Sequence, residues 1–205
     1  MLRLLLACLA FALAACGGPK ESALPAGSRV LALGDSLTAG YGVAPPQAWP
    51  ALLANRTGWV VVNGGISGDT SAGALGRLPA LLEEHRPALV LVTLGGNDML
   101  RKLPEAGTIA NLASILALIR EHGARAVLIA TPQPSVAGAV FRSLSAAGFY
   151  RTVATGSGVP LIEDAVADVL SDPLMKGDPL HPNAAGHALL EKKLYAALKK
   201  LGFAP

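Results

Sequence analysis

Four short polar segments of the chain carry the residue types that acyl transfer requires. Ser36 follows an apolar run and a glycine, Gly68 and Asn97 lie in two later glycine-rich segments, and Asp178 precedes His181 by three residues. A serine hydroxyl attacks a carbonyl when a base takes its proton, the base needs an orienting partner, and the developing oxyanion needs fixed donors. These residues offer a nucleophile, a base with its partner, and donors for the oxyanion.

The position of each residue predicts its role. Ser36 can be held at a tight turn from strand to helix, and the spacing of Asp178 and His181 lets the carboxylate reach the ring N–H within a single turn. The candidate oxyanion donors are the backbone N–H groups of Ser36 and Gly68 and the side-chain amide of Asn97. Ser36 is therefore a candidate nucleophile, with His181 as a candidate base and Asp178 as a candidate orienting group.

The same segments also have structural interpretations. Asp35 and Ser36 suit the cap of a following helix, and residues 178–183 suit a turn before a helix that Asn183 caps. Residues 95–98 could be an ordinary Gly/Asn loop. None of these interpretations excludes a catalytic role for the same residues.

Neighbouring polar residues are predicted to be structural. Asp98 should bond to backbone near the site, and Asp69 and Thr70 should cap the helix after them. Ser67 is a rival nucleophile, but no G-x-S-x-G elbow surrounds it. Structural positions are predicted for the remaining histidines, which are His85, His122 and His187. Acyl-pocket and core positions remain open alternatives for Met99, Leu100 and Leu180.

Continuous apolar runs predict the strands that must position these segments. The runs do not alternate with polar residues, which is typical of a parallel sheet covered on both faces. They span residues 29–33, 59–63, 88–94, 126–131 and 160–162. Helical spacing between them predicts helices over residues 47–56, 71–85, 108–122, 143–155 and 183–200. This alternation predicts an open three-layer α/β fold, whose ligands lie beyond the carboxyl ends of the strands.

Composition excludes several classes of protein. The chain has 205 residues, 52% of them hydrophobic, which suits one domain with a large core. Its net charge is +3 and no basic stripe is present, so nucleic-acid binding is not expected. Both cysteines, Cys8 and Cys16, lie in the N-terminal segment, and no HExxH pattern occurs. We therefore expect no disulfide, no cysteine metal site and no HExxH zinc helix in the folded part of the chain.

The N-terminus has the pattern of an export signal. A basic start precedes an apolar run at residues 4–15, which is short for a membrane span and has the length of a signal-peptide core. The run ends at Cys16, in a sequence that resembles the lipobox of bacterial lipoproteins. We expect residues 1–15 to be a signal peptide, residues 16–28 a tether, and residues 29–205 the enzyme domain. The predicted location is periplasmic, with a lipid anchor at Cys16 in the outer membrane, or else soluble after ordinary signal cleavage.

In order along the chain, four blocks resemble those of the GDSL-type SGNH hydrolases. The blocks are Gly34-Asp35-Ser36-Leu37, Gly68, Gly95-Gly96-Asn97-Asp98 and Asp178-x-x-His181. The segments at residues 48–53, 67–70 and 77–82 add a likeness to the bacterial thioesterase I/lysophospholipase L1/arylesterase group. This resemblance implies a flavodoxin-like α/β/α sandwich with a five-stranded parallel sheet. It also implies a serine hydrolase of acyl esters or thioesters, with the roles given above and no cofactor.

Two other functions remain open at this point. One is a carbohydrate O-deacetylase that uses the same site, and the other is an inactive lipid- or cell-wall-binding lipoprotein. Residues 131–135 depart from the related sequences, which leaves the acyl-chain preference open. The expected partners are a small acyl ester, a thioester or a lysophospholipid, with the chain acting as a monomer.

Overall fold

Five apolar segments form one parallel sheet in the computed structural model, which describes residues 22–140 and 142–205. The strand order is β2-β1-β3-β4-β5. The strands are β1 (Arg29–Gly34), β2 (Val60–Gly65), β3 (Leu89–Thr93), β4 (Arg125–Ile129) and β5 (Leu161–Ile162). In the parallel register, Leu31 of β1 lies opposite Val62 of β2 and Val90 of β3. All of β3, and all of β1 after Arg29, is buried, which explains the uninterrupted apolar runs.

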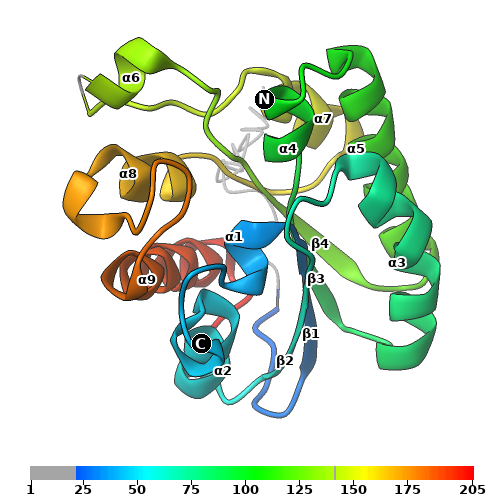
Figure 1. The fold of residues 1–205 in the computed structure, drawn as a ribbon. Helices are drawn as coiled ribbons and strands as arrows, with labels where there is room; N and C mark the ends of the chain where they lie inside the picture. Colours follow the sequence, from blue (N-terminus) through cyan, green and yellow to red (C-terminus); the bar gives the residue numbers. More distant parts are fainter. Residues whose placement is uncertain (1–21, 141) are drawn as a thin grey trace, which may run out of the picture.

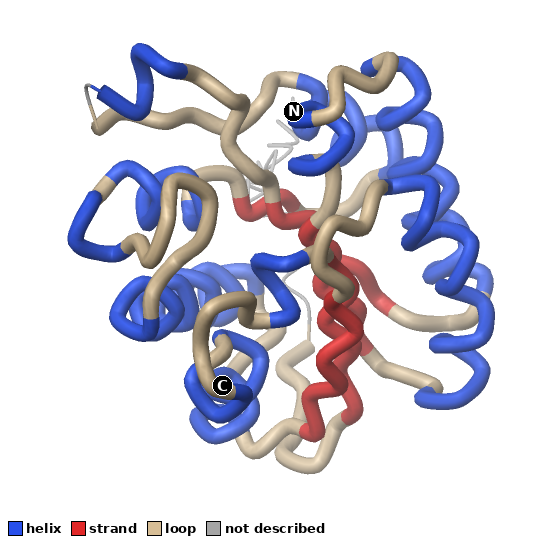
Figure 2. Tube along the Cα trace, in the orientation of Figure 1, coloured by secondary structure: helices blue, strands red, loops and turns tan. Residues whose placement is uncertain are grey.

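Helices cover both faces of this sheet, which is seen nearly edge-on in Figures 1 and 2. One core cluster joins the sheet to α2, α8 and α9, and a second joins it to α3, α5 and α7. The helices are α1 (Ser36–Ala39), α2 (Trp49–Thr57), α3 (Ser71–His85), α4 (Gly96–Leu100), α5 (Glu105–Glu121), α6 (Val136–Val140), α7 (Phe149–Ser157), α8 (Ala165–Ser171) and α9 (Ala184–Leu201), with 3-10 turns η1 (Pro45–Gln47) and η2 (Pro173–Met175). The predicted three-layer α/β/α fold with five parallel strands is confirmed.

One predicted helix, over residues 143–155, begins too early. The structure starts α7 at Phe149, and the preceding residues run antiparallel to the chain after β4. Gln133 N–H donates to Ser145 O at 2.9 Å, and Pro132 and Ala146 form a bridge. These bonds to a distant segment override the local helical spacing of apolar residues. They make the base of an arm, described over residues 131–140 and 142–148, which carries α6 (Figure 1).

Residues before position 29 already pack against the domain, although the sequence predicted that the enzyme domain starts at residue 29. Leu24 is buried, its N–H donates to Phe203 O at 2.8 Å, and its carbonyl accepts from Trp59 Nε1 at 3.3 Å. The predicted signal peptide and Cys16 lie outside the described residues. Within the described part of the chain, no helix is long and apolar enough to cross a membrane.

Two glycines let α1 lie directly on the ends of the strands. A β-carbon on Gly65 would come 2.2 Å from the backbone nitrogen of Ala39, and one on Gly34 would come 2.1 Å from Thr38 Oγ1. Any side chain at either position would displace α1. Since α1 begins at Ser36, the absence of these side chains fixes where the serine hydroxyl lies.

Candidate active site

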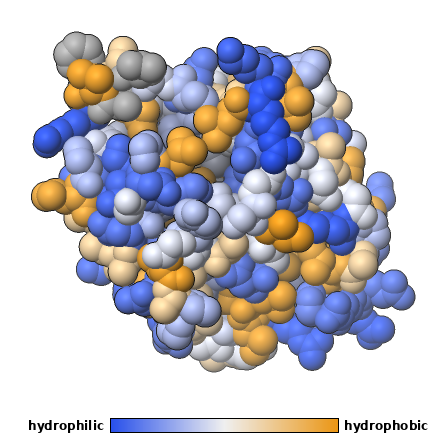
Figure 3. Space-filling model, in the orientation of Figure 1, coloured by the Kyte–Doolittle hydropathy of each residue, from blue (hydrophilic) through white to orange (hydrophobic). Residues whose placement is uncertain are grey.

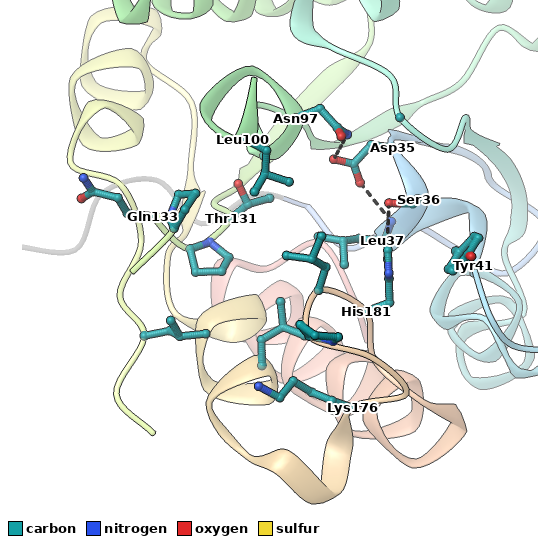
Figure 4. Close-up of a pocket in the computed structure, with 18 of the residues that line it drawn as sticks. Asp35, Ser36, Leu37, Tyr41, Asn97, Leu100, Thr131, Gln133, Lys176 and His181 are labelled. Atoms are coloured by element: carbon teal, nitrogen blue, oxygen red, sulfur yellow. Dashed lines mark hydrogen bonds between the residues drawn. The ribbon is translucent and has the colours of Figure 1, made fainter. Parts of the chain in front are cut away.

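Ser36 lies at the carboxyl end of β1, as the first residue of α1. Asp35 caps this short helix by accepting from Leu37 N–H at 3.0 Å, which holds the turn between strand and helix. The Ser36 hydroxyl lies 2.9 Å from His181 Nε2, within hydrogen-bond distance. Figure 4 shows this contact at the pocket wall. The predicted meeting of Ser36 and His181 is therefore present in the structure.

Asp178 holds the other nitrogen of the same imidazole. His181 Nδ1 lies 2.9 and 2.8 Å from the two carboxylate oxygens of Asp178. The carboxylate also accepts from the backbone N–H groups of Leu180, at 2.7 Å, and His181, at 2.8 Å. Because a carboxylate only accepts, Nδ1 carries the proton, and Nε2 is left to accept from Ser36. Desolvation raises the pKa of the Asp178 carboxyl, but these hydrogen bonds outweigh it and the pKa lies below its usual value.

An aromatic ring covers His181 from the side. The ring centroids of Tyr41 and His181 are 4.6 Å apart, with their planes tilted by 42°. Tyr41 is 53% exposed and lies beside His181, across the pocket from Gln133 (Figure 4). The imidazole is thus held by a carboxylate at one nitrogen and packed by a ring on its side.

The predicted oxyanion donors lie around Ser36. Ser36, Gly68 and Asn97 all line one pocket. The backbone N–H groups of Ser36 and Gly68 have no hydrogen-bond partner in the part of the chain that the structure describes. Gly68 has a φ of +80°, a left-handed conformation that favours glycine. Two backbone N–H groups that have no partner among the described residues therefore belong to residues of the same pocket wall.

Asn97 is engaged more fully than the sequence suggested. Its Nδ2 donates to Asp69 O at 3.0 Å and to Asp35 Oδ2 at 3.2 Å. Since both neighbours only accept, the amide nitrogen must face them, which fixes the orientation of the amide. Both amide hydrogens are in use, so donation to an oxyanion requires one of these bonds to be shared or exchanged.

Asp35 is a buried carboxylate behind the nucleophile. Only 2% of the residue is exposed, and burial raises the pKa of its carboxyl to about 6. The hydrogen bond from Leu37 N–H and the attraction of His181 lower this pKa, and burial outweighs both. Asp35 thus joins the Ser36 turn to Asn97 through a group that is costly to keep charged.

The loop between β2 and α3 is tied down by polar contacts. Thr70 caps α3 by accepting from Gly73 N–H at 3.2 Å, as predicted. Asp69 does not share this capping role; it pairs with Arg77 at 2.8 Å, and Arg77 also donates to Gly34 O at 3.1 Å. This ion pair joins the loop to the end of β1.

Asp98 bonds to backbone near the site, as the sequence predicted. It is buried and accepts from Ser71 N–H at 2.9 Å and from the Ser71 hydroxyl at 2.5 Å. Thr108 Oγ1 donates to the same carboxylate at 3.3 Å. Asp98 thereby connects the segment after β3 to the starts of α3 and α5.

The pocket beside Ser36 has a volume of about 560 Å³ and a mostly apolar wall. Leu100 and Leu180 line it, whereas Met99 packs against the core. The leucine and proline residues of this wall include Leu37, Leu100, Pro132, Pro134, Leu144, Leu170 and Leu180. Lys176 lies at its lower edge in Figure 4. Across the molecular face in Figure 3, apolar residues lie in separate patches among hydrophilic ones.

The remaining candidate residues do not join this centre. Ser67 lines the pocket, but its hydroxyl has no hydrogen-bond partner in the described chain. His122 bonds to Leu118 O at 2.8 Å, and His85 lies beside Glu84 at 3.7 Å. His187 is fully buried, and its Nδ1 accepts from Trp49 N–H at 3.4 Å. Among residues 22–140 and 142–205, no group of three His, Cys, Asp or Glu side chains could hold a metal.

Several contacts at the site were not predicted from the sequence. Tyr41 packs on His181, Arg101 donates to Gly68 O at 2.6 Å, and Tyr150 donates to Leu94 O at 2.6 Å. A Tyr close after the nucleophile and an Arg close after Asn97 are local signals that could have indicated the first two. Tyr150 comes from α7, and its contact depends on the tertiary fold alone.

Comparisons with known proteins agree with this geometry. The family model for GDSL-like lipases/acylhydrolases matches residues 32–189. The chain is 38% identical over 186 residues to Esterase TesA of Pseudomonas aeruginosa, covering 86% of this chain and 90% of the relative. It is 40% identical over 163 residues to Thioesterase 1/protease 1/lysophospholipase L1 of Escherichia coli, covering 77% of each.

A solved structure supports the same assignment. The psychrotrophic esterase EstA from Pseudoalteromonas sp., inhibited by monoethylphosphonate, is 32% identical and aligns with a TM-score of 0.74. The alignment covers 84% of this chain and 97% of that structure. The chain belongs to the GDSL-like lipase/acylhydrolase family.

Proposed function

We propose that this protein hydrolyses acyl esters and thioesters through an acyl-enzyme formed on Ser36. The observation that carries the proposal is the continuous chain of contacts from the Ser36 hydroxyl to His181 Nε2 at 2.9 Å, and from His181 Nδ1 to the Asp178 carboxylate at 2.8 Å. Such a chain provides a nucleophile, a base and the group that holds the base in the correct tautomer.

The reaction proceeds in two halves. His181 Nε2 takes the hydroxyl proton as Ser36 Oγ attacks the acyl carbonyl, and Asp178 stabilises the imidazolium that results. The imidazolium returns the proton to the alcohol or thiol that leaves, which gives the acyl-enzyme. Water then loses a proton to His181 as it attacks the acyl carbon. The imidazolium returns this proton to Ser36 Oγ as the acyl–serine bond breaks, which releases the carboxylic acid and restores the hydroxyl.

The negative charge of the tetrahedral intermediate faces the unpaired N–H groups of Ser36 and Gly68. Asn97 adds a third donor when one of its amide hydrogens turns from Asp35 or Asp69 toward the oxyanion. The bond to Asp35, at 3.2 Å, is the longer of the two and the easier to exchange. Fixed donors of this kind stabilise the transition state without reorganisation of solvent.

The apolar pocket favours an acyl chain over a sugar. Its lining of leucine and proline side chains offers few hydrogen-bond partners for hydroxyl groups. Relatives named esterase, arylesterase and thioesterase support ester and thioester substrates. A panel of p-nitrophenyl esters of increasing chain length, acyl-CoA thioesters, lysophospholipids and acetylated sugars tests this assignment. Preference for acetylated sugars would instead support the carbohydrate O-deacetylase.

The decisive experiment compares two serines that line the same pocket. Ser36→Ala should lower kcat for p-nitrophenyl butyrate by roughly 10³-fold or more, because the nucleophile is lost. Ser67→Ala is the matched control and should stay within about threefold of wild type, as its hydroxyl has no base. Substantial activity in Ser36→Ala, or an equal loss in Ser67→Ala, would overturn the proposal.

We also propose that the protein is exported to the periplasm and anchored in the membrane by a lipid on Cys16. The motif at residues 13–17, Leu-Ala-Ala-Cys-Gly, supports this proposal. Mass spectrometry of the mature N-terminus should find a diacylglyceryl cysteine at position 16, and Cys16→Ser should release the protein from the membrane fraction. An unmodified mature N-terminus would instead indicate ordinary signal cleavage.

A further inference from the structure

We infer that Arg101 is a positioning residue for the oxyanion side of the site, because its guanidinium holds the loop that carries Gly68. The inference rests on the proposed function, in which the Gly68 N–H binds the oxyanion. Arg101 follows α4 directly, and its Nη2 donates to the carbonyl of Gly68 at 2.6 Å. This short contact from a cation crosses between two loops that are distant in sequence.

The peptide group between Gly68 and Asp69 is bonded at both ends. Its N–H donates to Ile66 O at 3.0 Å, which closes a tight turn, and its carbonyl accepts from Arg101. The next carbonyl, of Asp69, accepts from Asn97 at 3.0 Å. Asn97 and Arg101 therefore hold two successive carbonyls of this loop.

These bonds restrain rotation about the backbone angles of Gly68. Glycine has no side chain that would limit its backbone angles, so a φ of +80° at this position depends on contacts from elsewhere. The Gly68 N–H belongs to the peptide group just before the one that Arg101 holds. When the following group is fixed, the direction of this N–H varies less.

Arg101 acts from outside the pocket. Gly68, Asn97 and Leu100 line the cavity, whereas Arg101 is absent from its wall. A β-carbon on Gly68 would lie 3.4 Å from Arg101 Nη2, so the cation rests against this glycine. Its positive charge also favours the negative charge that develops on the other side of the loop.

If Arg101 served only to stabilise the fold, its loss would lower the melting temperature. Arg101 is exposed, and no carboxylate pairs with it among residues 22–140 and 142–205. One exposed hydrogen bond contributes little to the free energy of folding. Loss of Arg101 should therefore reduce kcat while the melting temperature stays nearly constant.

The test compares two neighbouring cations. Arg101→Met should lower kcat for p-nitrophenyl butyrate roughly 10-fold with KM within about twofold, less than the loss of a whole oxyanion donor. The rate of labelling by a fluorophosphonate probe should fall by a similar factor. Lys102→Met removes the same charge from the next residue and should leave both rates unchanged. Arg101→Lys should be intermediate, and methylguanidinium added to Arg101→Ala should restore part of kcat.

The outcomes separate this inference from the proposed function. Wild-type protein that the probe labels, together with unchanged kcat and labelling in Arg101→Met, would overturn the role of Arg101 alone. An equal loss in Lys102→Met, or a loss confined to KM, would also overturn it. Wild-type protein that the probe does not label at Ser36 would overturn the proposed function, and this inference with it.

Discussion

Two carboxylates flank Ser36, and their surroundings shift their pKa values in opposite directions. Asp178 has a side chain that is 40% exposed, and hydrogen bonds from His181 and backbone N–H groups lower its pKa. Asp35 is 2% exposed, and burial raises its pKa to about 6. Both groups accept hydrogen bonds, so the difference comes from access to water.

The comparison separates two tasks of a carboxylate at one site. Asp178, stable as an anion, is suited to support a positive charge that appears and disappears on His181. Asp35 bonds to the Ser36 turn and to Asn97, and is suited to hold these two segments in fixed positions. If the proposed chemistry at Ser36 holds, we expect substitutions of the solvated anion and of the buried acceptor to change different measured properties.

The largest effect is expected at the solvated carboxylate. Asp178→Asn should lower kcat by roughly 10³- to 10⁴-fold, because an amide at this position no longer fixes the imidazole tautomer or stabilises the imidazolium. Its amide oxygen can still accept from Leu180 N–H, so thermal unfolding should change little. Steady-state kinetics with p-nitrophenyl butyrate provide the measurement. A loss below tenfold would show that another group orients His181.

Asp35, the buried carboxylate, should change how the free energy of unfolding depends on pH. The folded-state pKa of Asp35, about 6, lies above its usual value of 3.8, so the folded protein binds the proton more tightly. Its contribution is fully present below pH 3.8 and is lost as the pH rises through 6, a change of about 3 kcal/mol.

Urea unfolding of wild type and Asp35→Asn between pH 4 and pH 7 measures this change. The stability of the variant relative to wild type should rise by about 2 kcal/mol over this range, because part of the change already occurs below pH 4. The slope is diagnostic, since the lost hydrogen bond to Asn97 shifts the variant equally at every pH. The depressed pKa of Asp178 gives the opposite sign, with stability lost as the pH falls. If the free energy of unfolding varied with pH in the same way for wild type and Asp35→Asn, burial would not raise the pKa of Asp35.

His187 should oppose Asp35 in the same pH range. Burial lowers the pKa of this imidazole from 6.5 to about 4, and its Nε2 has no partner in the described chain. The unfolded chain then takes the proton first, so stability falls as the pH drops from 6.5 to 4, by about 3 kcal/mol. His187→Gln should remove this dependence and leave a steeper Asp35 slope. A variant that keeps the wild-type profile would exclude His187 as a titrating group.

The smallest effect is expected at Tyr41. Tyr41→Ala opens one side of the imidazole and should lower kcat roughly threefold, in line with the energy of a single ring pair. Tyr41→Phe keeps the ring and should match wild type. Equal losses in both variants would show that the hydroxyl acts instead of the ring.

Much of the fold could be predicted because local pattern and tertiary structure agree. The strand runs and the helix at residues 71–85 have apolar patterns that match their final burial. The family and the fold class are confirmed. The predicted helix at residues 143–148 failed because pairing with residues 131–133 depends on a segment that local spacing does not reveal.

The site was predictable to the extent that its residues lie at strand ends. Parallel strands bring their carboxyl ends to one edge, so Ser36, Gly68 and Asn97 were expected together, and the structure brings them together. The engagement of the Asn97 amide with Asp35 and Asp69, and the contact from Arg101 to Gly68, follow from exact loop conformations. The catalytic roles themselves remain predictions for the variants above.

The arm, described over residues 131–140 and 142–148, supplies one wall of the pocket from outside the segments that carry Ser36, Asp178 and His181. It follows β4, and a bridge between Pro132 and Ala146, outside the five strands of the sheet, closes its base. Gln133, Pro134, Ser135 and Leu144 from this arm line the pocket, whereas Ser36, Asp178 and His181 lie on other segments. We expect a graft of this arm between relatives to exchange one wall of the cavity while the predicted catalytic residues stay in place, and so to alter the preferred acyl chain within one scaffold.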